Sequence, residues 1–207
     1  MPHDRVQQLS DQLVAKWTSP KGVELMAAGA AVVGGLLEHG PLTTAEAGRL
    51  LGWPPGQVLD RFRAMDFALE TDGRGRITGA GVSLDDRRPH TMRLNGLTRY
   101  GWCAMDVLMF PLVLKEPSSA VTSRCAATGA PVTLTVTPDG VRDLVPTTAA
   151  VTLAPATGAD IREVFCDRVD FYADLGLARL AVEQDPELAA CPVSDAWTIA
   201  RRLADLF

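Results

Sequence analysis

The sequence predicts an α/β (α+β) protein in which a helical front half precedes a half built on β-strands. Apolar residues recur at helical spacing through residues 3–70, and from residue 90 onward they alternate with the period of two that strands show. The 207 residues, 47% of them apolar and 22% charged, are enough to bury a core. We therefore expect a winged-helix-like helical domain over residues 1–85 and a mixed-sheet α/β domain over residues 86–207 that carries a cysteine and aspartate site.

The N-terminal segment is predicted to form an amphipathic helix with an apolar stripe at Val6, Leu9, Leu13 and Trp17. It has neither the basic end nor the apolar run of a signal peptide. The most apolar stretch, LMAAGAAVVGGLL at 25–37, is shorter than the roughly 20 residues that span a membrane. We expect it to form a buried helix or helix pair, and the protein to be soluble and cytoplasmic with no membrane contact.

A short helix is predicted next, followed by a turn and a second helix. Thr43 or Thr44 can cap the first of these helices, and Gly52 can end it. Pro54 and Pro55 begin the turn. The second helix is amphipathic and is predicted over GQVLDRFRAMDFAL, residues 56–69.

The segment LETDGRGRITGAGVSL, residues 69–84, predicts a hairpin with a Gly-rich turn. The order helix, turn, helix and hairpin is that of a winged helix. On DNA such a domain would use four arginines of the second helix and the hairpin tip: Arg61, Arg63, Arg74 and Arg76. Aspartates on the same helix nearly cancel that charge, and the net charge of −5 does not favour nucleic acid. A compact scaffold or lid is the alternative role.

The second half is predicted to mix short strands with helical segments after a linker at 83–90, SLDDRRPH. A strand over 90–103 is expected to enter the Cys103 segment, followed by a short helix that Pro111 ends. One strand is expected at PVTLTVTPDGV, with a turn at Pro138, Asp139 and Gly140, and another strand is expected at AAVTLAP. A helical turn is then expected to lead into a strand near Cys166. A closing helix is expected over CPVSDAWTIARRLADLF, with Ser194 as a candidate cap.

The chain has four cysteines, none in a CxxC pair, which excludes zinc ribbons and thioredoxin-type motifs: Cys103, Cys125, Cys166 and Cys191. A reducing compartment does not favour disulfides. The default role for each cysteine is therefore that of a small buried apolar residue.

Cys103 and Asp106 lie three residues apart, so a helix places both side chains on one face. A thiol with a pKa near ~8.5 is mostly protonated at neutral pH. Burial among apolar neighbours raises the pKa of a carboxyl group and brings it closer to the pKa of the thiol. A proton can then pass from sulfur to oxygen and on to a substrate. The alternative is that Asp106 caps a backbone group.

Cys166 lies in VFCDRVDF, and with Cys103 it would form a soft site that suits Hg(II) or Cu(I) better than Mg²⁺ or Ca²⁺. Cys125, among small polar residues, is expected to be structural. Tyr100, Trp102 and Phe165 adjoin the two thiols. Aromatic residues such as these most often belong to the core. Because these three are so close to the thiols, we favour the alternative that they form the wall of a substrate pocket.

Three segments, YGWCAMDVLMFP, SRCAATGAPVTLTVTP and VFCDRVDFY, resemble the organomercurial (alkylmercury) lyases in order and spacing. The resemblance covers roughly residues 40–205 and is strong at 99–138 and 164–172. Two departures stand out: Asp167 follows Cys166 where some relatives have another cysteine, and Cys191 has no counterpart that we can place.

The resemblance implies cleavage of a carbon–mercury bond by protonolysis in mercury detoxification, with residues 86–207 as the catalytic domain. It makes Cys103 and Cys166 the thiols that hold the Hg(II) product, Asp106 the proton shuttle and Cys125 structural. It implies no organic cofactor, and it implies release of Hg(II) to free cytosolic thiols or to a mercuric reductase.

Two other functions remain open on the residues alone. One is a lyase-like protein that binds a soft metal and acts on another substrate. The other is a thiol-based, metal-responsive regulator that uses the winged helix on DNA. Asp106 separates them from a lyase, because binding needs only two thiols whereas protonolysis also needs a proton donor.

Overall fold

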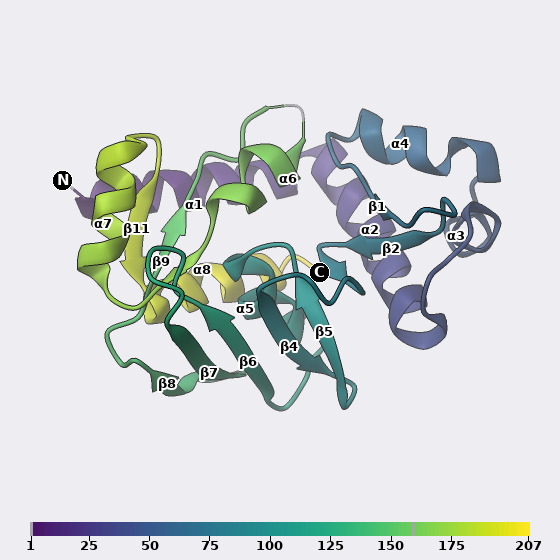
Figure 1. Ribbon diagram of the computed structural model, residues 1–207. Helices are drawn as coiled ribbons and strands as arrows, with labels where there is room; N and C mark the ends of the chain where they lie inside the picture. Colours follow the sequence, from purple (N-terminus) through teal and green to yellow (C-terminus); the bar gives the residue numbers. More distant parts are fainter. Residues whose placement is uncertain (1, 159) are drawn as a thin grey trace.

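Helices and antiparallel sheets pack together in the computed structural model of the protein, which describes residues 2–158 and 160–207 (Figure 1). The predicted α/β (α+β) class is confirmed. The helices are α1 (Pro2–Thr18), α2 (Pro20–His39), α3 (Thr44–Leu51), α4 (Val58–Ala64), α5 (Ala104–Val113), α6 (Ile161–Val164), α7 (Leu175–Gln184) and α8 (Val193–Ala204), with 3-10 turns η1 (Pro55–Gln57) and η2 (Cys166–Arg168).

The strands form two sheets. They are β1 (Glu70–Thr71), β2 (Ile77–Ala80), β3 (Val82–Ser83), β4 (His90–Leu94), β5 (Leu97–Gly101), β6 (Ser119–Arg124), β7 (Pro131–Thr137), β8 (Gly140–Val145), β9 (Ala150–Leu153), β10 (Phe171–Tyr172) and β11 (Ala189–Pro192). The larger sheet has the order β1-β2-β3-β5-β4-β6-β7-β8 and the smaller one β10-β9-β11. All strand pairs within the described residues are antiparallel, where a mixed sheet was expected. The short loops that join β1 to β2, β2 to β3, β4 to β5, β6 to β7 and β7 to β8 allow only this arrangement for those pairs.

The predicted N-terminal helix is confirmed as α1, and Leu9 and Leu13 of its stripe are buried. The apolar run that follows belongs to α2, a single helix of 20 residues that begins at the cap formed by Ser19. By length and composition α2 could cross a membrane, with a mean hydropathy of 1.2, but 44% of its most apolar window is buried inside the protein. The core helix of a soluble protein passes the same test of length and composition.

The cap predicted at Thr43 is confirmed. Thr43 Oγ1 accepts the N–H of Glu46 at 3.2 Å, and Glu46 Oε2 accepts the N–H of Thr43 at 2.8 Å, which is a capping box. Gly52 ends α3 in the left-handed conformation, as expected. Helix α4 is shorter than the predicted 56–69, because Asp66 adopts a φ of 58° and turns the chain.

The predicted hairpin is confirmed as β1 and β2. The order helix, turn, helix and hairpin is therefore present, although its assignment as a winged helix stays a prediction. Strand β3 then pairs with β5, so one sheet runs across the linker expected at 83–90. The division into domains at residues 85 and 86 also stays a prediction.

The single strand expected over 90–103 is wrong: the segment forms two strands, β4 and β5, joined at Asn95 and Gly96. Both residues have positive φ, 50° and 73°, as a tight hairpin turn requires. Elements that were not predicted are β6, β8, α7 and β11. Ser194 does not cap the closing helix, because α8 already begins at Val193 after Pro192.

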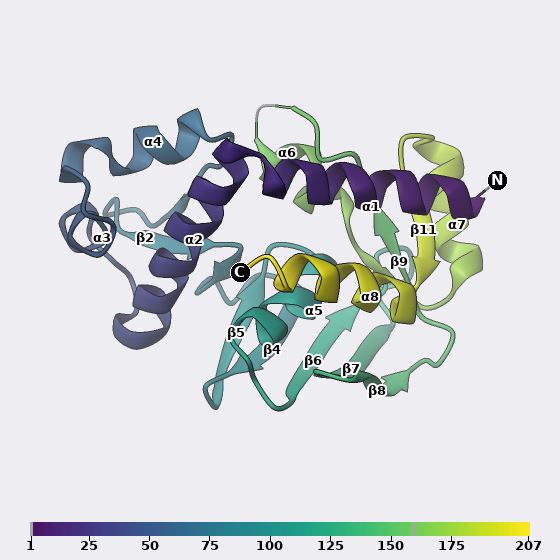
Figure 2. The ribbon, with the colours of Figure 1, turned by 180° about the vertical axis from the view of Figure 1, so that it is seen from behind.

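Helix α5 carries two of the candidate site residues and is buried along its length from Ala104 to Leu112. Pro111 does not end it, and the helix continues to Val113. Proline removes one helical hydrogen bond in this last turn, and burial of the surrounding side chains compensates. Figure 2 shows α8 beside α5 over the larger sheet, so α5 is enclosed between the sheet and other helices.

Replacing Thr43 by alanine should lower the free energy of unfolding by about 1 kcal/mol, because the variant loses the oxygen that accepts the Glu46 N–H. Urea denaturation measures the difference. Thr44→Ala, one residue further on and inside the helix, is the control and should lose less than half as much. Equal losses in the two variants would contradict the cap.

Candidate active site

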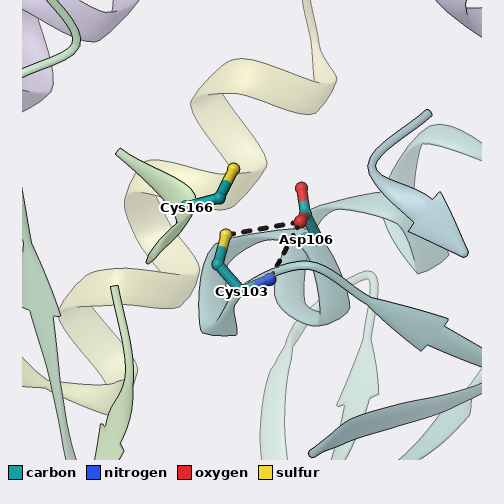
Figure 3. A group of neighbouring side chains, drawn as sticks. All are labelled: Cys103, Asp106 and Cys166. Carbon is teal, nitrogen blue, oxygen red and sulfur yellow. Dashed lines mark hydrogen bonds between the residues drawn. The ribbon is translucent and has the colours of Figure 1, made fainter. Parts of the chain in front are cut away.

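The start of α5 brings a thiol and a carboxyl group together. Cys103 is the N-cap residue, with extended backbone, and Asp106 is the third residue of the helix. Asp106 Oδ2 accepts the backbone N–H of Cys103 at 3.1 Å and lies 3.4 Å from Cys103 Sγ, whose thiol donates to it (Figure 3). The same oxygen therefore caps the helix and accepts the hydrogen bond of the thiol. The two alternatives for Asp106, cap and proton acceptor, are combined in one group.

Gly101 allows this tight approach. A Cβ on Gly101 would lie 2.8 Å from Val107 Cγ1 and 3.1 Å from Asp106 Cβ. Strand β5 therefore has to end on glycine for the first turn of α5 to fold back against it.

The second thiol comes from the corner between α6 and η2. Cys166 is the first residue of η2, and the corner is held to α5 by the hydrogen bond from Ala104 N to Val169 O, 2.9 Å long. Arg168 fixes the other side of the corner through ion pairs to Asp185 at 2.6 Å and Glu187 at 2.9 Å. Residues distant in sequence are thus brought to a defined place beside α5.

The structure brings together the three residues singled out in the sequence. One ligand atom from each of Cys103, Asp106 and Cys166 lies within 4.8 Å of the others. The three side chains point toward one another in Figure 3 and are 1%, 7% and 7% exposed. Two soft sulfur atoms and one carboxylate in a dry site suit a thiophilic metal.

Burial sets the protonation of the site. It raises the pKa of Asp106 to about 7, against hydrogen bonds from Cys103 that lower it. Burial likewise raises the pKa of Cys103 well above its usual value. For Cys166 the hydrogen bond with Cys103 lowers the pKa, but burial and nearby carboxylates outweigh it, so its pKa is also raised. The two thiols therefore stay protonated at neutral pH until a metal displaces their protons.

An apolar cavity of about 60 Å³ adjoins the cluster, with Asp106 and Cys166 in its wall. Trp102 and Phe165, proposed from the sequence as pocket walls, line it. Tyr100 does not belong to the lining set among the described residues. It lies half-buried in β5.

Trp102 is held by a buried polar network that was missed in the sequence. Its Nε1 donates to Glu70 Oε2 at 3.3 Å, and Glu70 also binds Arg88 at 2.7 Å and accepts the hydroxyl of Ser83. Burial tends to raise the pKa of Glu70, but these hydrogen bonds hold it below its usual value. No motif marks these residues, because they come from β1, β3 and the loop after it. The guanidinium of Arg162 stacks over the indole at 5.4 Å.

The other two cysteines lie outside the cluster. Cys125 is buried at the end of β6, where its backbone N–H donates to Ala130 O at 2.7 Å in a turn. Its structural role stays a prediction. Cys191 is buried in β11, and burial raises its pKa to about 12.

The basic residues of the front half are mostly paired within the protein. Arg61 stacks over Trp53 at 5.0 Å, Arg63 pairs with Asp60 at 2.9 Å, and Arg76 pairs with Asp72 at 2.8 Å. Internal partners of this kind do not favour the regulator that binds DNA.

Two buried thiols and a carboxyl group beside an apolar cavity define a thiol-based site for a soft metal that carries an organic group. The model of the alkylmercury lyase family, MerB, matches residues 85–205. The chain is 39% identical over 172 residues to an alkylmercury lyase of Streptomyces lividans (82% of this chain, 79% of that one) and 36% identical over 165 residues to one of Pseudomonas putida (79% and 76%). The chain belongs to the alkylmercury lyase family, and the resemblance seen in its three motifs is confirmed.

A solved structure supports the fold. The structure titled "Crystal structure of the mercury-bound form of MerB2" matches with a TM-score of 0.75 and 18% identity, covering 98% of each chain. At that identity the match shows that the two chains share a fold.

The raised pKa of Asp106 predicts a pH-dependent stability. Between the ordinary value of 3.8 and about 7 the folded protein binds more protons than the unfolded chain, so the free energy of unfolding falls as pH rises through this window. Asp106→Asn keeps an oxygen for the Cys103 N–H and removes the titration. The free energy of unfolding of the variant, relative to that of the native protein, should therefore be higher at pH 8 than at pH 5 by about 1 kcal/mol or more.

Chemical denaturation at the two pH values measures this gain. Asp86→Asn, at an exposed carboxylate, is the control and should show no comparable gain. A constant difference between Asp106→Asn and the native protein at both pH values would contradict the raised pKa.

Proposed function

We propose that this chain cleaves the carbon–mercury bond of organomercury compounds by protonolysis, which gives a hydrocarbon and Hg(II). The observation that carries the proposal is the meeting of two thiols and one carboxyl group within 4.8 Å. Membership of the alkylmercury lyase family supports it. Neither the soft-metal binder without lyase activity nor the DNA-binding regulator is favoured by any feature of the site.

Capture of the substrate uses both thiols. The compound R–Hg–SR′ exchanges its carrier thiol for one protein sulfur and releases R′SH. The second sulfur then adds to mercury as its proton passes to the carboxylate. Cys103 is placed for this transfer, because its thiol already donates to Asp106. Mercury is then bound by the organic carbon and two sulfurs, and the negative charge donated by sulfur makes the carbon more basic.

Cleavage returns the proton. The Asp106 carboxyl group delivers it to the carbon, the electron pair of the Hg–C bond becomes that of the new C–H bond, and Hg(II) stays between Cys103 and Cys166. Mercury is neither oxidised nor reduced. A group with a pKa of about 7 is suited to accepting and releasing a proton at neutral pH. Holding it against a single carbon supplies much of the rate by proximity.

We propose that the reaction needs no organic cofactor, because the two thiols and the carboxyl group supply every protein group in these steps. We propose that the protein works in the cytoplasm and that Hg(II) leaves to free cytosolic thiols or to a mercuric reductase. Cys125 is proposed to be structural, and Asp167, exposed and next to Cys166 in the chain, is proposed to influence how the product is held.

Cys103→Ser and Cys166→Ser should each lower hydrocarbon release by at least ~100-fold, because a hydroxyl replaces a ligand of mercury and the carbon no longer gains charge from two thiolates. Headspace methane from methylmercury, with excess free thiol, measures turnover. Cys191→Ala is the matched control, a buried cysteine outside the cluster, and should keep native turnover. Native turnover in either serine variant would overturn the assignment of that thiol.

Asp106→Asn should still bind Hg(II) through the two sulfurs, while hydrocarbon release falls by roughly 10²–10⁴-fold because the proton donor is lost. Equilibrium dialysis with Hg(II) and headspace methane measure the two properties separately. Unimpaired cleavage refutes the shuttle. A native protein that binds Hg(II) but releases no hydrocarbon refutes the lyase in favour of a soft-metal binder.

A further inference from the structure

One wall of the cavity beside the reacting groups is formed by α2. Leu25, Met26 and Gly29 line it, and their spacing places them on one face of the helix. The same cavity is lined by Asp106 and Cys166. A group attached to mercury at the thiols therefore extends into a space that α2 bounds.

Gly29 differs from the other glycine of the lining. A Cβ on Gly81 would meet Phe110 Cε2 at 2.7 Å, and Gly81 has a φ of 82°, so packing and backbone both require glycine there. A Cβ on Gly29 meets no heavy atom within 4 Å. Glycine inside a helix lowers stability relative to alanine, yet no neighbour excludes a side chain at Gly29. Packing therefore does not require glycine at position 29, and a side chain there would take up open space at the cavity lining.

The room available in the cavity is small. Its volume of about 60 Å³ is less than half of the roughly 150 Å³ that holds benzene in an apolar protein interior. A methyl group fits this volume. A phenyl group needs the open space at Gly29 together with movement of flexible methionines in the lining, such as Met26 and Met109.

We infer that Gly29 is a specificity-determining residue, and that the absence of a side chain at this position of α2 sets the largest organic group that the site accepts. The inference rests on the proposed lyase function. The substrate class includes compact apolar groups, alkyl or aryl, because the side chains of the lining are apolar apart from Asp106, Cys166 and the indole N–H groups of Trp17 and Trp102. The N–H of Trp102 is already donated to Glu70.

The test compares Gly29→Leu with Gly34→Leu. Gly34 lies in the same helix, is exposed, and also has no heavy atom within 4 Å of its Cβ, but it lies outside the cavity lining. The two variants therefore share the change in helix propensity and differ in where the leucine points. Methane from methylmercury and benzene from phenylmercury give kcat/KM for each substrate.

Gly29→Leu should lower the ratio of phenyl to methyl kcat/KM by at least tenfold, and Gly34→Leu should leave the ratio within twofold of native. Gly29→Ala should lower the ratio less, and it decides the matter if the leucine variant does not fold. An unchanged ratio, or an equal loss for both substrates in a folded variant, overturns the inference while the lyase function stands. A native protein that releases neither hydrocarbon overturns the lyase function itself.

Discussion

The hydrogen bond from the backbone N–H of Cys103 to the carboxyl of Asp106 is the interaction on which the rest of the site depends. It caps α5, and because the same oxygen lies against the Cys103 thiol, the helix start is also the place where a proton can leave sulfur. The helix is buried almost throughout, so the carboxyl is dry and its pKa stands at about 7. An exposed cap of the same geometry would keep the low pKa of an ordinary carboxyl group and would be a poor acceptor for the thiol proton at neutral pH.

The remainder of the structure keeps that helix start enclosed and supplies the second sulfur. Gly101 lets β5 end against the first turn of α5, and the corner that carries Cys166 is bonded to the same turn through Ala104. Trp102 forms part of the cavity wall and is locked by Glu70, whose own charge is compensated by Arg88. An apolar cavity next to a polar cluster is thus maintained by hydrogen bonds that lie on the other side of the wall.

The parts of the fold that depend on local chemistry could be predicted from the sequence. The cap at Thr43, the hairpin β1–β2 and the i, i+3 relation of Cys103 and Asp106 are of this kind. The turn at Asn95–Gly96 has a local signal in the Asn-Gly pair itself. Pro111 does not end α5 as expected, because burial keeps the helix intact beyond it. The approach of Cys166 to Cys103 has no local signal, since it depends on how the α6–η2 corner packs, and only the family motif indicated it. Glu70 could not be predicted, because its burial is compensated by residues of other segments.

The origin of the two sulfurs in separate segments has a consequence for turnover. Mercury held by both would act as a cross-link between α5 and η2 that exists only in the folded chain, so by thermodynamic linkage the product complex would be the most stable form of the protein. Spontaneous dissociation from such a chelate is slow. On the proposed function, departure would require an incoming thiol to displace one sulfur at a time. That exchange would begin at Cys166, which lines the cavity, rather than at Cys103, which is absent from the lining and is 1% exposed.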